Sequence, residues 1–566
     1  MKVQHPTNVG AFDRKALGAQ AAALRAAGRL KEAEEVYRRL VAMVGSPAAF
    51  NELCSILMAL GRNKEALDFI EQALARHPDH LKLAAQRGVI LERLRRYGEA
   101  IDVYERVLLR DPNLVLVISN LAGLLNLQGR HDEAVDLYRR SLVTEPNRAI
   151  HSNLLLAMNY SGRYDQGALF AEHKRWAALH APTPSIVEPF TNARDLNRRL
   201  RVGYVSPDFN THPVAFFIGA VIANHDRNAV EVVCYSSTFA QDKITSALRG
   251  MNVVWRDIAA LDDASAARLI RDDGIDIAVD LSGHTAGNRL LTLARRPAPI
   301  EATYLGYPNT TGMGAIDYRF TDAWADPPGE SDRTHSEILI RLPGGFLAYT
   351  PPANMPPVRE LPAPANGRVT FGSFNNLAKI SPETIDLWSL VLAAVPDAQL
   401  MIKSRSFADA ALRERFCRLF EARGVSDDHL LLLSEPVGPV DHYDTFNRID
   451  IALDTVPYNG TTTTCEALWM GVPVVALAGD RHASRVGVSI LNAAGLPELV
   501  ASTSDAYIAI AQGLASDLGS LAALRASLRG RLASSALLDA RRLTHALEAA
   551  YRSAWRSWCN GAVAVG

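Results

Sequence analysis

Residues 449–476 read IDIALDTVPYNGTTTTCEALWMGVPVVA, and this stretch decides the fold. An apolar run at Ile449–Leu453 predicts a buried strand, and a turn containing Gly460 follows it. A helical segment then opens in threonines and leads to a second apolar run at Pro473–Ala476. Strand, helix and strand in this order predict a parallel α/β unit.

The same alternation extends over most of the chain. One series of apolar runs lies at Leu200–Val205, Val230–Tyr235, Val253–Arg256, Ile275–Leu281, Ala302–Leu305 and Tyr318–Thr321. A second series lies at Val369–Phe374, Gln399–Lys403, Leu430–Leu433, Ile449–Leu453 and Pro473–Ala476. Helical segments such as Ser265–Asp272 separate the runs, which predicts two Rossmann-like lobes with a cleft between them. The GxGxxG pattern of dinucleotide-binding folds does not occur.

The N-terminal third of the chain repeats itself. Small residues recur every 34 positions at Ala66, Ala100 and Ala134, with Ala33 and Gly167 one position off that spacing. A bulky residue follows four positions later, at Tyr37, Ile70, Tyr104 and Tyr138, and prolines close three units at Pro78, Pro112 and Pro146. This pattern resembles the tetratricopeptide repeat, in which helix pairs stack into a superhelix with a concave face.

The predicted concave face carries one series of polar residues, Glu52, Gln86, Asn120 and Asn153. Amide side chains at Asn120 and Asn153 could bond the backbone of an acceptor peptide without reading its sequence. The alternative is a polar surface on solvated helices.

Six segments follow from these patterns. They are the repeats at 15–181, a linker at 182–198, a first lobe at 199–349, a Pro-rich linker at 350–367, a second lobe at 368–504, and helices at 505–566 that pack back on the lobes.

Composition limits the class of protein. The 566 residues are 48% hydrophobic and 21% charged, with a formal net charge of −1, so the global basic excess of a nucleic-acid binder is missing. The five cysteines are scattered, which argues against a disulfide framework or a structural zinc site. The sequence shows no signal peptide and no run long enough for a membrane span, so we expect a cytoplasmic protein without a membrane partner.

The threonine-rich helix start after Ile449–Leu453 is the strongest candidate for chemistry. The backbone N–H groups of Thr462 and Thr463 belong to the first helical turn, where they suit a pyrophosphate. Glu466 follows on the same helix and could accept hydrogen bonds from ribose hydroxyls. The ordinary alternative is a threonine N-cap with a glutamate in its first turn.

Two more strand ends carry titratable residues. Lys379 lies after the strand that ends at Phe374, where a cation could neutralise a departing diphosphate. Asp208 and His212 follow the strand Leu200–Val205, and either could polarise an acceptor hydroxyl or take its proton. A solvated loop lysine, a capping aspartate and a surface histidine are the alternatives.

Gly-rich turns supply further candidates. The segment DLSGHT, residues 280–285, contains His284, and LGYP, residues 305–308, contains Gly306 and Pro308; such turns let backbone approach a sugar closely. The segment PVGPVDH, residues 436–442, contains Gly438 and His442 and could frame a nucleobase. Taken alone, each segment is better explained by plain turn chemistry.

These segments, in this order and behind this repeat array, resemble the O-linked N-acetylglucosamine transferase family. The motifs are RVGYVSPDFNTHP at 201–213, RPAPI at 296–300, LGYP at 305–308, FNNLAKISP at 374–382 and LDTVPYNGTT at 453–462. The resemblance implies a two-lobed fold of the glycosyltransferase B type, that is, an α plus α/β protein with an N-terminal repeat superhelix. It also implies an inverting, metal-independent transfer from UDP-N-acetylglucosamine to Ser or Thr hydroxyls of proteins. We therefore expect a UDP-sugar donor, protein acceptors, no cofactor, no metal and no nucleic-acid partner.

The resemblance also implies roles for single residues. Lys379 would stabilise the leaving diphosphate, and Thr462 and Thr463 would hold it through their N–H groups. Glu466 would hold the ribose, His442 would stack near the base, and Asn376 takes a position usually given to Gln. In the His-Pro pair, His212 and Pro213 would lie by the sugar and acceptor together with Asp208.

Several positions depart from the family pattern. His284 stands where the animal enzymes have Tyr, Phe216 replaces a His, and Pro439 stands where a Lys is expected three residues before His442. The short array and the missing insertion between the lobes indicate a bacterial member. These departures leave other donors open: GDP-fucose, as in the plant relative Spindly, or UDP-glucose transferred to Asn. A nucleotide-binding repeat scaffold with little catalysis is a further alternative, and the oligomeric state is open, a homodimer included.

Overall fold

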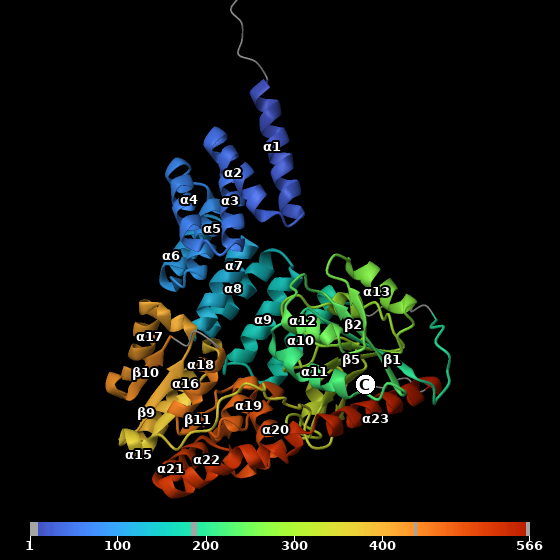
Figure 1. The fold of residues 1–566 in the computed structure, drawn as a ribbon, viewed down its shortest axis with the longest axis vertical. Coiled ribbons are helices and arrows are strands. Elements are labelled where there is room, and N and C mark those ends of the chain that lie inside the picture. The colour runs from blue at the N-terminus through green and yellow to red at the C-terminus, as the bar shows by residue number, and fades with distance from the viewer. Residues whose placement is uncertain (1–8, 183–188, 435–438, 562–566) are drawn as a thin grey trace, which may run out of the picture. The chain divides into compact units, whose positions relative to one another are not determined.

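The computed structural model describes the backbone of residues 9–182, 189–434 and 439–561. It describes the side chains of residues 15–182, 189–434 and 442–561. Residues 9–182 form paired helices, as the repeat pattern predicts (Figure 1). The helices are α1 (Val9–Ala26), α2 (Leu30–Val44), α3 (Pro47–Ala59), α4 (Asn63–Arg76), α5 (Leu81–Arg93), α6 (Tyr97–Arg110), α7 (Val115–Leu127), α8 (His131–Thr144), α9 (Arg148–Tyr160) and α10 (Gln166–His180).

Small residues let these helices approach each other. Ala66, Ala100 and Ala134 are fully buried. A Cβ added at Gly88 would lie 2.2 Å from the ring of Tyr104, so the repeat aromatic occupies the space that the glycine leaves. Size complementarity of this kind fixes the register of one helix against the next.

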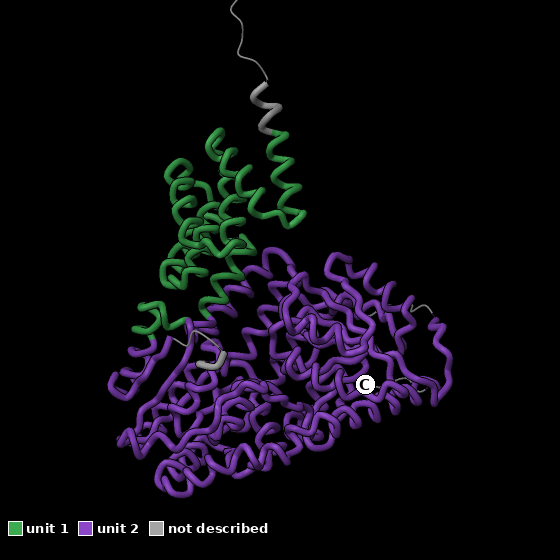
Figure 2. The backbone as a smooth tube through the Cα atoms, in the orientation of Figure 1, with its two compact units in different colours: residues 1–125, 406–415 green, residues 126–405, 416–566 purple. Residues whose placement is uncertain are grey.

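Two compact units divide the chain (Figure 2). One comprises residues 1–125 and 406–415, and the other comprises residues 126–405 and 416–566. The helices α8–α10 therefore belong to the same unit as both α/β lobes, whereas our sequence analysis assigned them to a single repeat domain.

The first lobe is a seven-stranded parallel sheet in the order β3-β2-β1-β4-β5-β6-β7. Its strands are β1 (Leu200–Ser206), β2 (Val230–Ser236), β3 (Val254–Asp257), β4 (Ile277–Asp280), β5 (Ile300–Tyr304), β6 (Tyr318–Thr321) and β7 (Ile338–Arg341). The intervening helices are α11 (Pro213–Asn224), α12 (Lys243–Arg249), α13 (Asp263–Asp272) and α14 (Leu290–Leu293). Six of these strands agree with the predicted runs, and β7 is an addition.

The second lobe is a six-stranded parallel sheet in the order β10-β9-β8-β11-β12-β13. Its strands are β8 (Thr370–Ser373), β9 (Gln399–Lys403), β10 (Leu430–Leu433), β11 (Ile451–Leu453), β12 (Val474–Leu477) and β13 (Val500–Ala501). Its helices are α15 (Ala363–Asn366), α16 (Pro382–Ala394), α17 (Ala410–Glu421), α18 (Pro439–Asp444), α19 (Thr462–Trp469) and α20 (Val486–Ala493). The strand order reverses beside β1 and β4 in the first lobe and beside β8 and β11 in the second. Ligands bind α/β sheets at the carboxyl ends of such strands.

The last helices, α21 (Ser504–Ser516), α22 (Leu518–Ala533) and α23 (Ala540–Cys559), pack against the lobes (Figure 1). The hydroxyl groups of Tyr551 in α23 and Tyr204 in β1 lie 3.0 Å apart, and Glu548 of α23 pairs with His225. Among the described helices, none is by itself long and apolar enough to cross a membrane; α21 and α22 meet that test only as a pair bent by 96°.

Candidate active site

The loop after β11 leads into the start of α19, where backbone N–H groups are placed to bind an anion. The first helical hydrogen bond runs from the N–H of Cys465 to the C=O of Thr461, at 3.1 Å, so the N–H groups of Thr462 and Thr463 point beyond the helix end. A Cβ at Gly460 would lie 2.6 Å from the Thr464 hydroxyl, so only glycine fits at this turn. The helix dipole adds partial positive charge at the same place.

Asp454 holds this loop in shape, although the sequence analysis did not single it out. Its buried Oδ1 accepts the N–H of Thr455 at 2.9 Å and that of Gly460 at 2.7 Å. Burial raises the pKa of Asp454 to about 6, against the opposing effect of those two hydrogen bonds. The carboxyl group thus fixes the turn that presents α19.

Lys379 lies beside the same loop. Its Nζ donates to the C=O of Asn459 at 2.8 Å and lies 4.5 Å from the centre of the Tyr458 ring. Burial lowers the pKa of Lys379 to about 8, and the nearby Asp454 carboxyl opposes that change. The site therefore holds a cation near the N-terminus of α19, as expected for a group that meets a diphosphate.

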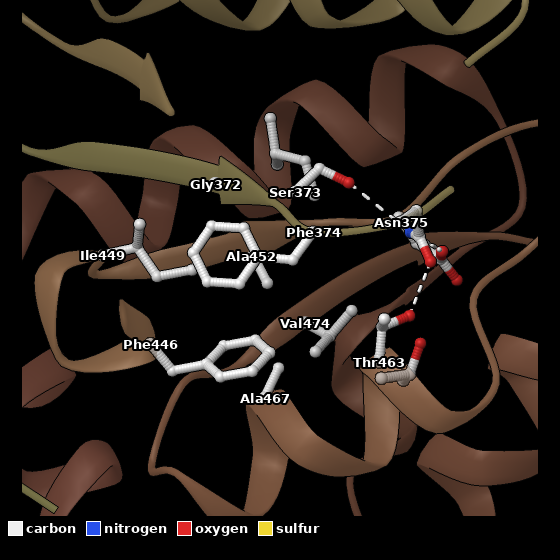
Figure 3. Close-up of a pocket in the computed structure, with 13 residues that line it drawn as sticks. Gly372, Ser373, Phe374, Asn375, Phe446, Ile449, Ala452, Thr463, Ala467 and Val474 are labelled. Carbon is white, nitrogen blue, oxygen red and sulfur yellow. Dashed lines mark hydrogen bonds between the residues drawn. The ribbon is translucent and has the colours of Figure 1, made fainter. Parts of the chain in front are cut away.

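Two neighbouring asparagines have different roles. Asn376 is exposed, and its side chain accepts the N–H of Ala378 at 3.1 Å, so it caps the short turn before Lys379. Asn375 is buried, and its Oδ1 accepts the Thr463 hydroxyl at 2.5 Å (Figure 3). Asn375 and Thr463 also line a small cavity of about 20 Å³, room for about one water. The sequence analysis chose Asn376 and missed Asn375.

A buried lysine joins the predicted ribose and base residues. Glu466 Oε2 lies 3.1 Å from His442 Nε2, and the Lys403 Nζ donates to His442 Nδ1 at 2.9 Å. Because Nδ1 accepts, the neutral ring carries its proton on Nε2 and donates it to Glu466. Burial lowers the pKa of Lys403 to about 7, opposed by the charge of Glu466. Lys403 ends β9 and supplies a cation beside His442. Gly438 lies outside the described residues.

In the first lobe, Asp208 and His212 lie together after β1. His212 Nδ1 is 3.7 Å from Asp208 Oδ1 and also accepts the N–H of Val214 at 3.3 Å, so His212 caps α11. Pro213 is the first residue of that helix and is exposed. Burial raises the pKa of Asp208, while the His212 charge lowers it. The His212 side chain keeps 43% of its surface exposed and is accessible to a substrate.

The other first-lobe candidates lie deeper. His284 is buried: its Nε2 donates to the C=O of Thr311 at 2.9 Å, and the Ser152 hydroxyl lies 3.4 Å from its Nδ1. Burial lowers the pKa of His284 well below its ordinary value. Both ring nitrogens are thus engaged inside the protein, which differs from the sugar contact we expected.

The turn that contains Gly306 and Pro308 packs closely on the end of β4. A Cβ at Gly306 would lie 1.7 Å from the C=O of Leu281, and Pro308 is buried. The glycine is therefore required by this close packing between two loops of the lobe.

Several of the polar repeat residues that we expected to bind an acceptor peptide contact other residues of the repeats. Asn120 donates to the Tyr104 hydroxyl at 3.2 Å, and Gln86 donates to the C=O of Asn51 at 2.7 Å. Glu52 pairs with Arg25. Asn120 and Asn153 belong to different compact units, so their joint role stays a prediction.

Comparisons with known proteins agree with this arrangement. The sequence profile of Glycosyl transferase family 41 matches residues 172–351 and 358–547, and tetratricopeptide-repeat profiles match 52–114 and 116–144. A probable UDP-N-acetylglucosamine–peptide N-acetylglucosaminyltransferase SPINDLY of Petunia hybrida is 45% identical over 73% of this chain and 44% of its own length. The UDP-N-acetylglucosamine–peptide N-acetylglucosaminyltransferase of Caenorhabditis elegans is 26% identical over 73% of this chain and 46% of its own length.

A solved structure extends the match to the whole fold. A mutant O-GlcNAc transferase of Thermobaculum terrenum has a TM-score of 0.84 and 39% identity, covering 91% of this chain and 98% of that one. The chain spans less than half the length of the curated relatives quoted above. The matched profile covers both lobes and extends into the helices on either side, and the chain therefore belongs to glycosyltransferase family 41 and is a glycosyltransferase with N-terminal tetratricopeptide repeats.

Proposed function

We propose that this glycosyltransferase moves N-acetylglucosamine from UDP-N-acetylglucosamine to Ser or Thr hydroxyls of proteins, with inversion and without a metal ion. The acceptor oxygen attacks C1 of the sugar as the bond from C1 to the diphosphate oxygen breaks. The diphosphate leaves with the bonding electrons, and the hydroxyl proton passes to a base on the protein. Attack from the face opposite the leaving group inverts the anomeric centre.

The observation that carries the proposal is the position of Lys379 against the loop that leads to the start of α19. The Lys379 ammonium lies 2.8 Å from the Asn459 carbonyl, in the loop that leads directly to Thr462 and Thr463. A cation and two free N–H groups supply the charge and the donors that a departing diphosphate needs. With Lys379 in this role, the reaction requires no divalent cation to neutralise the leaving group.

The other candidates complete the donor and acceptor sides. Glu466 and His442 would hold the ribose and stack against the base of the nucleotide. His212 and Asp208 follow β1 of the first lobe, where either could receive the acceptor proton. The repeats would present cytoplasmic protein acceptors along their concave face.

Calorimetric titration with UDP, GDP, UDP-N-acetylglucosamine and UDP-glucose, in the presence of EDTA, tests the donor side. We expect UDP to bind with a dissociation constant in the micromolar range and more tightly than GDP. We also expect the protein to transfer labelled N-acetylglucosamine to peptides, and Lys379→Met to abolish this transfer. Binding that requires a metal, or normal turnover by Lys379→Met, would overturn the proposed chemistry. No binding of any nucleotide would favour the scaffold alternative.

A second donor, GDP-fucose, is favoured by one observation. The chain is 45% identical to a SPINDLY protein but 26% identical to the C. elegans enzyme, and fucose transfer is what the resemblance implies for the Spindly branch. Preference for GDP over UDP in the same titration would move the assignment to this donor.

A further inference from the structure

The end of helix α9 contacts loops of both lobes through two consecutive residues. Asn159 is fully buried; its amide donates to the Tyr307 hydroxyl at 3.1 Å, and its Oδ1 accepts from Asn309 at 3.0 Å. Tyr307 and Asn309 lie in the first-lobe loop after β5. The ring of the next residue, Tyr160, packs against that of Tyr458 in the second lobe in a tilted arrangement, with ring centres 4.8 Å apart and planes inclined by 32°.

Tyr458 is the residue over which Lys379 lies. The Lys379 ammonium is 4.5 Å from the centre of the Tyr458 ring and donates to the C=O of the next residue, Asn459. Asn459 is itself held by the N–H of Gly487 and by the C=O of Ala483. A continuous set of contacts therefore runs from the repeat helix through Tyr458 to the ammonium group.

The turn after α9 is fixed to the second lobe as well. The buried guanidinium of Arg481 donates to the carbonyls of Ser161 and Tyr164. A Cβ at Gly162 would lie 2.4 Å from Glu383 at the start of α16. Because the backbone is held on both sides of Tyr160, its ring has little freedom to move away from Tyr458.

We propose that Tyr160 is a positioning residue for transfer: the repeat helix α9 holds the Tyr458 ring, and through it the Lys379 ammonium, at the site of the leaving group. This inference rests on the proposed function, since it assigns Lys379 to the diphosphate. It gives the last repeat pair a part in the chemistry in addition to holding acceptors.

Two variants separate the ring from its volume. Tyr160→Phe keeps the ring, and we expect it to behave as the parent. Tyr160→Leu keeps an apolar side chain but loses the ring–ring contact with Tyr458, and we expect kcat to fall about tenfold or more while KM for the acceptor is unchanged. Tyr37→Ala, which removes a buried ring from α2, is the control for general loss of stability in the array.

Direct titration of Lys379 tests the inference without any turnover. Competitive acetylation of the free protein, read by mass spectrometry over a pH series, gives the apparent pKa of this amine. Burial lowers the pKa of Lys379 to about 8, and we expect this value in the parent, in Tyr160→Phe and in Tyr37→Ala. Tyr160→Leu should admit water to the amine and so raise its pKa. The same titration curve in Tyr160→Leu and the parent would overturn the inference, even if the enzyme proved to transfer no sugar. A shifted curve in a protein that binds no nucleotide would support the positioning and reject only the proposed function.

Discussion

At the scale of single residues, we expect Lys379 to make nucleotide binding sensitive to pH. Burial lowers the pKa of Lys379 to about 8 in the free protein, and a bound diphosphate favours the charged form and raises it again. Between those two values, each nucleotide bound takes up one proton. We expect the affinity for UDP to fall by up to about tenfold per pH unit above about pH 8. The slope of the logarithm of UDP affinity against pH gives the number of protons taken up on binding, and calorimetry of Lys379→Met should show one proton fewer than the parent. An unchanged slope would contradict the assignment.

Lys403 is expected to act on the nucleotide through His442. Its ammonium fixes the His442 tautomer that donates to Glu466, and it balances the charge of that buried carboxylate. Lys403→Met should weaken nucleotide binding by about tenfold or more, the effect of losing a hydrogen bond to a charged group. The exposed Lys174 of α10 offers the matched control, Lys174→Met, with unchanged affinity. Equal affinities of the two variants would show that Lys403 has no such role.

Sequence patterns named candidate site residues that lie in motifs but did not name the residues that they contact. Lys379 lies beside the loop that leads to Thr462 and Thr463, as expected, because the ends of adjacent parallel strands meet at one edge of a sheet. Lys403 was missed because its contact with His442 spans 39 positions and depends on the order of β9 and β8 in the sheet. Asn376 was named because it takes a position that the family usually gives to Gln, whereas the contact of Asn375 with Thr463 spans 88 positions and is not visible in the sequence.

At the scale of elements, the turn before α19 depends on the absence of a side chain at Gly460. A Cβ there would meet Thr464, Asn375 and Thr463 within 2.9 Å, so Gly460→Ala must displace the residues that shape the helix start. We expect about tenfold weaker UDP binding, the effect of a lost hydrogen bond or two at a charged ligand. Gly513→Ala in α21, which meets no atom within 4 Å, is the matched control and should bind normally.

The predicted elements were those with strong local patterns. All eleven strand predictions correspond to strands, and the paired helices follow the 34-residue period. The two missed strands, β7 and β13, have four and two residues and lie at the edges of their sheets, where a short apolar run gives little periodicity. The division of the repeats between two compact units was also not predictable, because it depends on tertiary contacts of α8–α10 that the repeat pattern does not encode.

At the scale of the whole molecule, the two lobes share one compact unit, and buried polar groups join them in addition to a common hydrophobic core. His482 of the second lobe lies 2.7 Å from Asp326 of the first, and both side chains are buried. Burial opposes ionisation of Asp326, yet His482 holds the pKa of this carboxyl below its ordinary value. Nearby, Ser489 donates to Asp322 and Arg485 donates to the C=O of Trp324. The relative position of the two halves of the site therefore depends on this contact.

Breaking the Asp326–His482 pair should loosen the whole catalytic unit. His482→Ala removes the imidazole that bonds the buried Asp326 carboxylate. The Thr321 hydroxyl still donates to this carboxylate, and His335 lies 3.9 Å from it. We therefore expect a loss of up to about 3–5 kcal/mol of unfolding free energy, the cost of breaking a buried pair. Chemical denaturation should show this loss, whereas His545→Ala, at an exposed position of α23, should change little. Adding Asp326→Asn to His482→Ala removes the negative charge of the buried carboxylate and should recover part of the lost unfolding free energy. Transfer activity should fall from the parent to the double variant to His482→Ala, because both lobes contribute residues to the proposed site. A stable His482→Ala protein with normal turnover would show that other contacts are sufficient to hold the two lobes in place.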